Sequence, residues 1–183
     1  MKTKDRKIEE LAYKFRRAME KARHNGEFRY EVYLKDFPVG SCGVTCDYLG
    51  VYLNDNGFST YQISASYEER THAWLVLDDS RIDHEAMEEL MKQEELPPEI
   101  QDLYKQYGGD CFDATLSPRL SEKAFQNGLI IDITGDQFGW VPVYVGPKAR
   151  RYSVYEQMGY YHVDETVACA RDAIYNKIIS YIE

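Results

Sequence analysis

The spacing of apolar residues predicts a helix near the start of the chain. Between residues 4 and 24, apolar side chains recur every three or four positions, with Lys, Arg and Glu between them. Gly26 follows directly, where it can cap the C-terminus of this helix. We expect the short segment that comes next, residues 28–34, to be extended.

A second helix and two strands are predicted in the middle of the chain. The helix starts at Cys42, with Ser41 in position to be its N-cap, and the Asn-Gly pair at 56–57 can stop it. Residues 58–66 and 72–79 are rich in β-branched and aromatic side chains and predict strands.

The remaining pattern alternates between helix and strand. Acidic helices are predicted at about 83–94 and 97–107. A strongly apolar strand is predicted at 129–134, and a second strand, interrupted by a proline, at 140–146. An amphipathic helix is expected over about 164–182. This order of elements favours an α+β fold.

Length, charge and hydropathy narrow the classes of function. The 183 residues suit one α+β domain over residues 1–183. The net charge of −9 argues against nucleic acid as the main partner, since phosphate binding needs a concentrated positive surface. We expect no membrane partner, because the longest apolar runs are far shorter than about 18 residues.

The first residues are charged and lack the apolar core of a secretory signal, so we expect a cytoplasmic protein. Its cysteines would then be reduced. They are Cys42, Cys46, Cys111 and Cys169.

The segment Phe37–Asp47, FPVGSCGVTCD, is the first candidate for chemistry. A thiol at the first position of a helix lies in the field of the free N–H groups, which favours the thiolate. Cys42 has this place, and its own N–H or a neighbouring one can stabilise an oxyanion. Cys46 lies one turn further, where we interpret it as a small buried packing residue.

A cysteine nucleophile needs a base and a group that orients the base. His72 opens a predicted strand, so we expect its ring at the end of a sheet, facing a cleft. Asp132 lies in an otherwise apolar strand, where a carboxylate needs a partner. A histidine or an aspartate in such a place is often structural, and it is the combination Cys, His, Asp that favours catalysis.

Three motifs carry a resemblance to a known group of enzymes. The segments FPVGSCGVTCDYLGVYLNDNGF, THAWLVLDDSRIDHE and IIDITGDQF resemble those of bacterial papain-like and transglutaminase-like cysteine enzymes, over about residues 37–138. The resemblance implies an α+β fold with the nucleophile helix packed on an antiparallel sheet and flanking N- and C-terminal helices. It implies Cys42 as nucleophile, His72 as general base and acid, and Asp132 as the residue that orients His72.

The resemblance also implies attack of the thiol on an amide or acyl carbonyl, with no metal and no cofactor. Ser41, Gly43 and Gln137 are candidates for contact with the substrate or its oxyanion. Trp74 lies on the same strand face as His72, where it would line the cleft or simply pack. The acidic insertion 78–127 would form a lid or cover one side of the cleft.

The leading hypothesis is therefore a cysteine-dependent acyl-transfer enzyme that acts on amide bonds of a protein or peptide. Hydrolysis would make it a peptidase, an amidase or a glutamine deamidase, and attack by an amine would make it a transglutaminase-type cross-linker. A zinc site built from Cys42 and Cys46 with His72 or His162 is a second hypothesis. A third is a non-catalytic interaction or toxin-neutralising protein, with a protein partner bound through the acidic helices 83–107.

Overall fold

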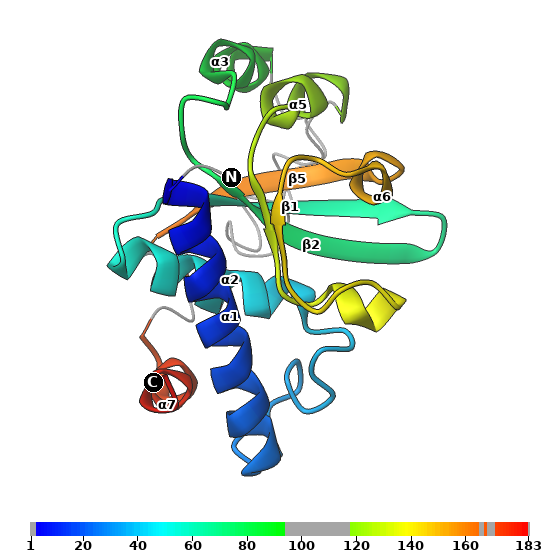
Figure 1. The fold of residues 1–183 in the computed structure, drawn as a ribbon. Helices are drawn as coiled ribbons and strands as arrows, with labels where there is room; N and C mark the ends of the chain where they lie inside the picture. Colours follow the sequence, from blue (N-terminus) through cyan, green and yellow to red (C-terminus); the bar gives the residue numbers. More distant parts are fainter. Residues whose placement is uncertain (1–2, 94–117, 165–166, 168–170, 183) are drawn as a thin grey trace, which may run out of the picture.

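An antiparallel sheet of five strands lies at the centre of the protein (Figure 1). The computed structural model describes residues 3–93, 118–164, 167 and 171–182. Neighbouring strands are antiparallel, in the order β4-β3-β2-β1-β5. The strands are β1 (Thr60–Tyr67), β2 (Arg70–Leu77), β3 (Ile130–Asp132), β4 (Tyr144–Gly146) and β5 (Glu156–Val163). The predicted α+β class is therefore confirmed.

Helices pack on both faces of this sheet. The elements are α1 (Thr3–His24), α2 (Cys42–Asp55), α3 (His84–Gln93), α5 (Pro118–Phe125), the 3-10 helix η2 (Gly135–Phe138), α6 (Arg150–Ser153) and α7 (Ala173–Ser180). One core joins α1, α2 and α7 to the sheet, and a second core joins α3, α5 and α6 to the opposite face. Figure 1 shows α3 and α5 at the other end of the molecule from α7. Among the described residues, no helix has the length and apolarity needed to cross a bilayer.

The alternation of side chains along β2 and β3 brings two of the candidate residues to one face. Ala73, Leu75 and Leu77 of β2 belong to the core under α1 and α2. Successive side chains of a strand point to opposite faces. His72 therefore shares the other face with Trp74, and Asp132 of β3 lies on that same face, because its neighbour Ile131 is in the core under α1 and α2.

The segment before α2 differs from the expectation of an extended strand. Residues 28–34 form successive turns, in which Glu31 N donates to Phe28 O and Leu34 N donates to Glu31 O. Phe28 and Leu34 are both buried in the core under α1. In a strand, Tyr30 and Val32 would share a face with these two residues, but they are 87% and 73% exposed, so the segment does not bury one strand face.

The C-terminal part contains a strand that the sequence pattern did not predict. β5 pairs with β1, and the register of this pairing shifts at a bulge between Ser64 and Ala65 of β1. The final helix begins later than expected, at Ala173, where the Asp172 carboxylate accepts from Tyr175 N at 2.7 Å. The local N-cap thus sets the start of α7.

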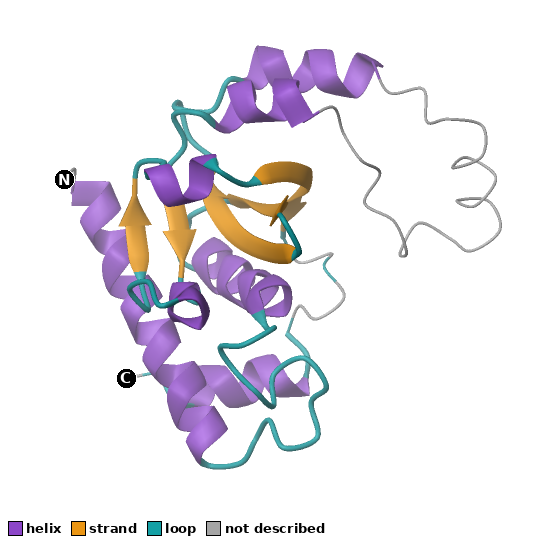
Figure 2. Ribbon diagram, turned by 90° about the vertical axis from the view of Figure 1, so that its right-hand side faces the viewer, coloured by secondary structure: helices purple, strands orange, loops and turns teal. Residues whose placement is uncertain are grey.

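The acidic insertion is described only at its two ends. α3 confirms the first predicted acidic helix, while the second, at 97–107, lies outside the described residues. Met87 of α3 and Phe125 of α5 pack into the same core as Trp74 and Tyr160. Figure 2 shows α3 and α5 lying side by side next to the sheet. The described ends of the insertion therefore cover part of the sheet face that carries His72.

Candidate active site

Cys42 is the first residue of α2, as predicted. Ser41 occupies the N-cap position, but its side chain makes no capping hydrogen bond to the helix. Its hydroxyl instead donates to Pro38 O at 2.9 Å, and the residue is buried. Because the Ser41 side chain does not cap α2, the first N–H groups of the helix remain suited to an anion such as a thiolate or an oxyanion. The Ser41 hydroxyl therefore holds the loop that leads into α2.

His72 and Asp132 form a buried pair between adjacent strands. The distance from His72 Nε2 to Asp132 Oδ2 is 2.9 Å, and the two side chains are 0% and 1% exposed. The ring does not face an open cleft, contrary to the prediction. Four aromatic rings surround it with centroids 4.9–6.1 Å away, from Trp74, Phe138, Trp140 and Tyr155.

Hydrogen bonds fix both oxygens of Asp132. Oδ1 accepts from the backbone N–H of Thr134 at 2.9 Å and from its hydroxyl at 3.2 Å. Oδ2 accepts from the Tyr152 hydroxyl at 2.9 Å in addition to the bond with His72. Tyr152 was not a candidate in the sequence analysis, since it lies 20 residues from Asp132 on a short helix outside the three motifs.

The thiol of Cys42 and the ring of His72 interact electrostatically. Burial disfavours the thiolate, but the close approach and charge of His72, together with the backbone of Ala73 and Gly43, lower the pKa of Cys42. Burial also disfavours the imidazolium, but Asp132 and Cys42 raise the pKa of His72 to about 9. Both shifts favour the thiolate–imidazolium pair.

The nitrogen that remains for the thiol is His72 Nδ1, because Nε2 is bonded to Asp132. Nδ1 is buried and has no hydrogen-bond partner of ordinary length and angle among the described residues. The Cys42 contact is therefore looser than a formed hydrogen bond, which is common in catalytic pairs without substrate.

The short β3 strand leaves room for α2 at this point. β3 pairs with β2 only at Leu75 and Val76. Further along the same edge of β2, at Ala73, β3 no longer pairs with it. The Cys42 thiol takes up this place, within hydrogen-bonding reach of the Ala73 backbone. The structure thus brings Cys42, His72 and Asp132 together from α2, β2 and β3.

Comparison with protein-family models, curated proteins and solved structures finds no match to this chain. A functional assignment therefore rests on the geometry of the site itself.

Arg16 of α1 connects the two loops that carry the site. Its guanidinium donates to Ile133 O at 2.6 Å and to both carboxylate oxygens of Asp136 at 2.8 and 2.7 Å. The same group lies over the ring of Phe37, 4.7 Å from its centroid. Since Ile133 and Asp136 follow Asp132, and Phe37 precedes Cys42, Arg16 helps to set the distance between the segments that carry Asp132 and Cys42.

Gln137 makes a second connection between these segments. Its Oε1 accepts from Gly40 N at 3.4 Å, and its Nε2 donates to Thr134 O at 3.0 Å. The structure therefore places this candidate beside the nucleophile loop, with one amide hydrogen already bonded to the protein.

The other candidates from the sequence have distinct environments. Gly43 has space beside its Cα, since a Cβ added there would lie 3.8 Å from Gln62 Nε2. Trp74 is buried and packs against Tyr152 as well as His72. Cys46 is buried in the core, as predicted, and burial raises the pKa of its thiol well above the usual value.

No group of three or more His, Cys, Asp or Glu side chains suited to a metal ion occurs among the described residues. His162, considered as the alternative to His72 in a zinc site, instead lies against Tyr61 and has its Nδ1 3.3 Å from an oxygen of Asp164.

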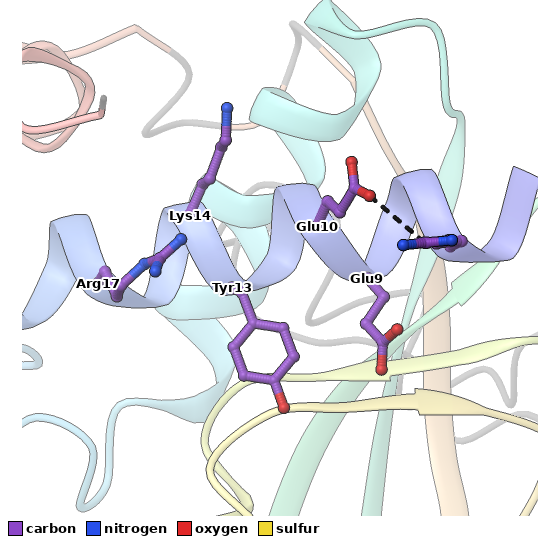
Figure 3. Close-up of a pocket in the computed structure, with 6 residues that line it drawn as sticks. Glu9, Glu10, Tyr13, Lys14 and Arg17 are labelled. Atoms are coloured by element: carbon purple, nitrogen blue, oxygen red, sulfur yellow. Dashed lines mark ion pairs between the residues drawn. The ribbon is translucent and has the colours of Figure 1, made fainter.

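A shallow depression of the surface lies along the solvent side of α1 (Figure 3). An ion pair of 3.7 Å joins Arg6 to Glu10 there. The residues that line this depression all belong to α1: Arg6, Glu9, Glu10, Tyr13, Lys14 and Arg17. It includes none of the residues around Cys42.

Proposed function

We propose that this protein is a cysteine-dependent acyl-transfer enzyme that acts on amide bonds. The observation that carries the proposal is the convergence of Cys42, His72 and Asp132 at the start of an uncapped helix. A buried His–Asp pair beside a thiol of lowered pKa is the arrangement that cysteine nucleophiles need.

The chemistry follows from the placement of these groups. The Cys42 thiolate attacks the carbonyl carbon, and N–H groups at the start of α2 stabilise the oxyanion. As the C–N bond breaks, the His72 imidazolium donates its Nδ1 proton to the leaving amine. The product is a thioester on Cys42, and neutral His72 then takes a proton from the water that attacks it. Release of the carboxylic acid restores the thiolate–imidazolium pair.

The papain-like or transglutaminase-like architecture belongs to the same proposal. It is supported by the position of α2, whose first residue meets an antiparallel sheet that carries His72 and Asp132 on adjacent strands. We favour hydrolysis of a protein or peptide amide, because water needs no second binding site. A peptidase, an amidase and a glutamine deamidase share this chemistry, and an amine in place of water would give cross-linking.

The pH dependence of iodoacetamide labelling at Cys42 tests the activated thiol. Fragment-ion mass spectrometry separates Cys42 from Cys46, which lies close by in the sequence. We expect the wild-type midpoint well below the value of about 8.5 that is typical of a free thiol. In His72→Ala the midpoint should return toward about 8.5, because the imidazolium that stabilises the thiolate is gone.

Buried Cys46 serves as an internal control and should label slowly in both proteins. A midpoint near 8.5 at Cys42 in wild type, unchanged in His72→Ala, would contradict the enzymatic proposal. It would favour the non-catalytic interaction protein instead.

Activity on an accepted amide should follow a bell-shaped pH profile. The acid limb reports formation of the Cys42 thiolate, whose pKa is lowered. The alkaline limb reports loss of the proton that His72 gives to the leaving amine, so it should lie at about pH 9. The measurement is kcat/KM from pH 4 to 11, and an alkaline limb near the ordinary histidine value of about 6.5 would contradict this assignment.

A further inference from the structure

Tyr152 lies in direct contact with the proposed catalytic residues, although it comes from a separate part of the chain. It belongs to α6, it is 1% exposed, and its hydroxyl lies 2.9 Å from Asp132 Oδ2. The same oxygen is 2.9 Å from His72 Nε2. Tyr152 and His72 therefore share one acceptor atom.

The surroundings of Tyr152 leave its ring little freedom to move. Its ring packs against Trp74 and Trp140, with centroids 5.2 and 5.6 Å away. The Arg151 guanidinium lies 5.3 Å from the centroid of the Tyr152 ring. Burial and the nearby carboxylate raise the pKa of the Tyr152 hydroxyl, so it stays a protonated donor across the working pH range.

The opposite oxygen of Asp132 is held from a different direction, by the backbone N–H and the hydroxyl of Thr134. Thr134 holds only Oδ1, so the carboxylate could still tilt about that oxygen and carry its bond to His72 with it. A second donor at Oδ2 fixes the plane of the carboxylate. That plane determines where Oδ2 meets His72 Nε2, and hence the direction in which Nδ1 points.

We propose that Tyr152 is a positioning residue of this site: its hydroxyl holds Asp132 Oδ2 toward His72 Nε2, which keeps His72 Nδ1 directed at Cys42. The inference rests on the proposed function, since it concerns the same three residues. It adds α6 and the C-terminal segment to a site whose sequence motifs end near residue 138.

The chain offers a matched control for the loss of a buried tyrosine hydroxyl. Tyr175 of α7 is 4% exposed, and its hydroxyl donates to Asp55 Oδ2 at 2.9 Å. Burial and Asp55 also raise the pKa of this hydroxyl, so it too remains a donor. Tyr175 belongs to the core under α1 and α2, and its hydrogen bond does not involve the catalytic residues. Tyr175→Phe therefore removes the same chemical group without touching the triad.

The experiment compares iodoacetamide labelling of Cys42 from pH 4 to 10 in wild type, Tyr152→Phe and Tyr175→Phe. All three are measured at a temperature where circular dichroism shows them folded. We expect both variants to lose thermal stability, because each loses a buried hydrogen bond. Only Tyr152→Phe should label several-fold more slowly at pH 6, with its midpoint moved toward that of His72→Ala.

A rescue variant separates orientation from packing. Incorporation of 4-aminophenylalanine at position 152 keeps the ring and supplies an N–H donor in place of the hydroxyl. This variant should restore the wild-type labelling profile. It can be measured even if Tyr152→Phe does not fold.

The outcomes separate this inference from the proposed function. A low midpoint in wild type that is unchanged in Tyr152→Phe would overturn the inference and leave the triad intact. Equal shifts in Tyr152→Phe and Tyr175→Phe would also overturn it, since a general loss of stability would then explain both. A failure of the aminophenylalanine variant to restore labelling would argue against the donor role. A wild-type midpoint near that of a free thiol would overturn both proposals.

Discussion

Asp132→Asn is expected to slow the labelling of Cys42 at pH 6 by about 10- to 100-fold. An ordinary thiol with a pKa of about 8.5 is less than about 1% ionised at this pH, whereas a His-paired thiol is largely ionised. The greater nucleophilicity of the more basic thiolate offsets part of this loss. In Asp132→Asn the carboxylate is replaced by a neutral amide, which removes the negative charge that stabilises the imidazolium at His72 Nε2.

The amide would also present its NH₂ group to Nε2, which then has to act as an acceptor. The ring proton moves to Nδ1, and the neutral ring can no longer support the thiolate. Iodoacetamide rates with mass-spectrometric assignment to Cys42 measure the effect.

Thr134→Val is the matched control for Asp132→Asn. It removes the 3.2 Å hydroxyl bond to Oδ1 but keeps the 2.9 Å bond from the backbone N–H. We expect a stability loss of about 0.5–1.5 kcal/mol and a labelling rate at pH 6 close to wild type. If Asp132→Asn labels as fast as Thr134→Val at pH 6, the aspartate does not stabilise the imidazolium.

Asp136→Ala is expected to lower the free energy of unfolding by about 2–3 kcal/mol. Removing one partner of a buried ion pair costs about 3–5 kcal/mol, because the other charge is left without compensation. The Arg16 side chain is 7% exposed, but that of Asp136 is 29% exposed, and Glu20 Oε1 still accepts from Arg16 Nε at 2.8 Å, so the expected loss is smaller. Urea denaturation measures the difference.

Arg16→Met supplies the second half of a double-mutant cycle. The double variant Arg16→Met/Asp136→Ala should lose less free energy of unfolding than the two single variants lose in sum, since neither charge of the pair remains in it. Strict additivity would show that the two groups do not interact in solution. Because the same pair fixes the turn after Asp132, we also expect slower Cys42 labelling in Asp136→Ala.

The parts of the fold that were predicted correctly have a strong local pattern. α1, α2 and the β1–β2 hairpin each contain several periods of apolar spacing, and the predicted regions overlap the observed ones. The turns at 28–34 and the strand β5 were missed for the opposite reason. β5 is stabilised by pairing with β1, and Phe28 and Leu34 by a core that α1 supplies.

The residues of the candidate site also differ in whether the sequence alone could identify them. Cys42, His72 and Asp132 could be selected from the sequence because each residue is chemically unusual at its position: a cysteine at a helix start, a histidine opening a strand, and a carboxylate in an apolar strand. Tyr152 and Arg16 carry no such signal. Tyrosines are frequent in this chain, and Arg16 lies on a helix with many other basic residues.

The α+β class, the helix that starts at Cys42 and the choice of Cys42, His72 and Asp132 as candidates could be inferred from the sequence alone, because they depend on local periodicity and residue type. Three further features arise only when the chain is folded: His72 is enclosed by aromatic rings, Tyr152 shares an oxygen of Asp132 with it, and Arg16 links the segments that carry Asp132 and Cys42. These contacts join residues from 20 to more than 100 positions apart. Their formation depends on how the sheet and helices pack, which local sequence patterns do not specify.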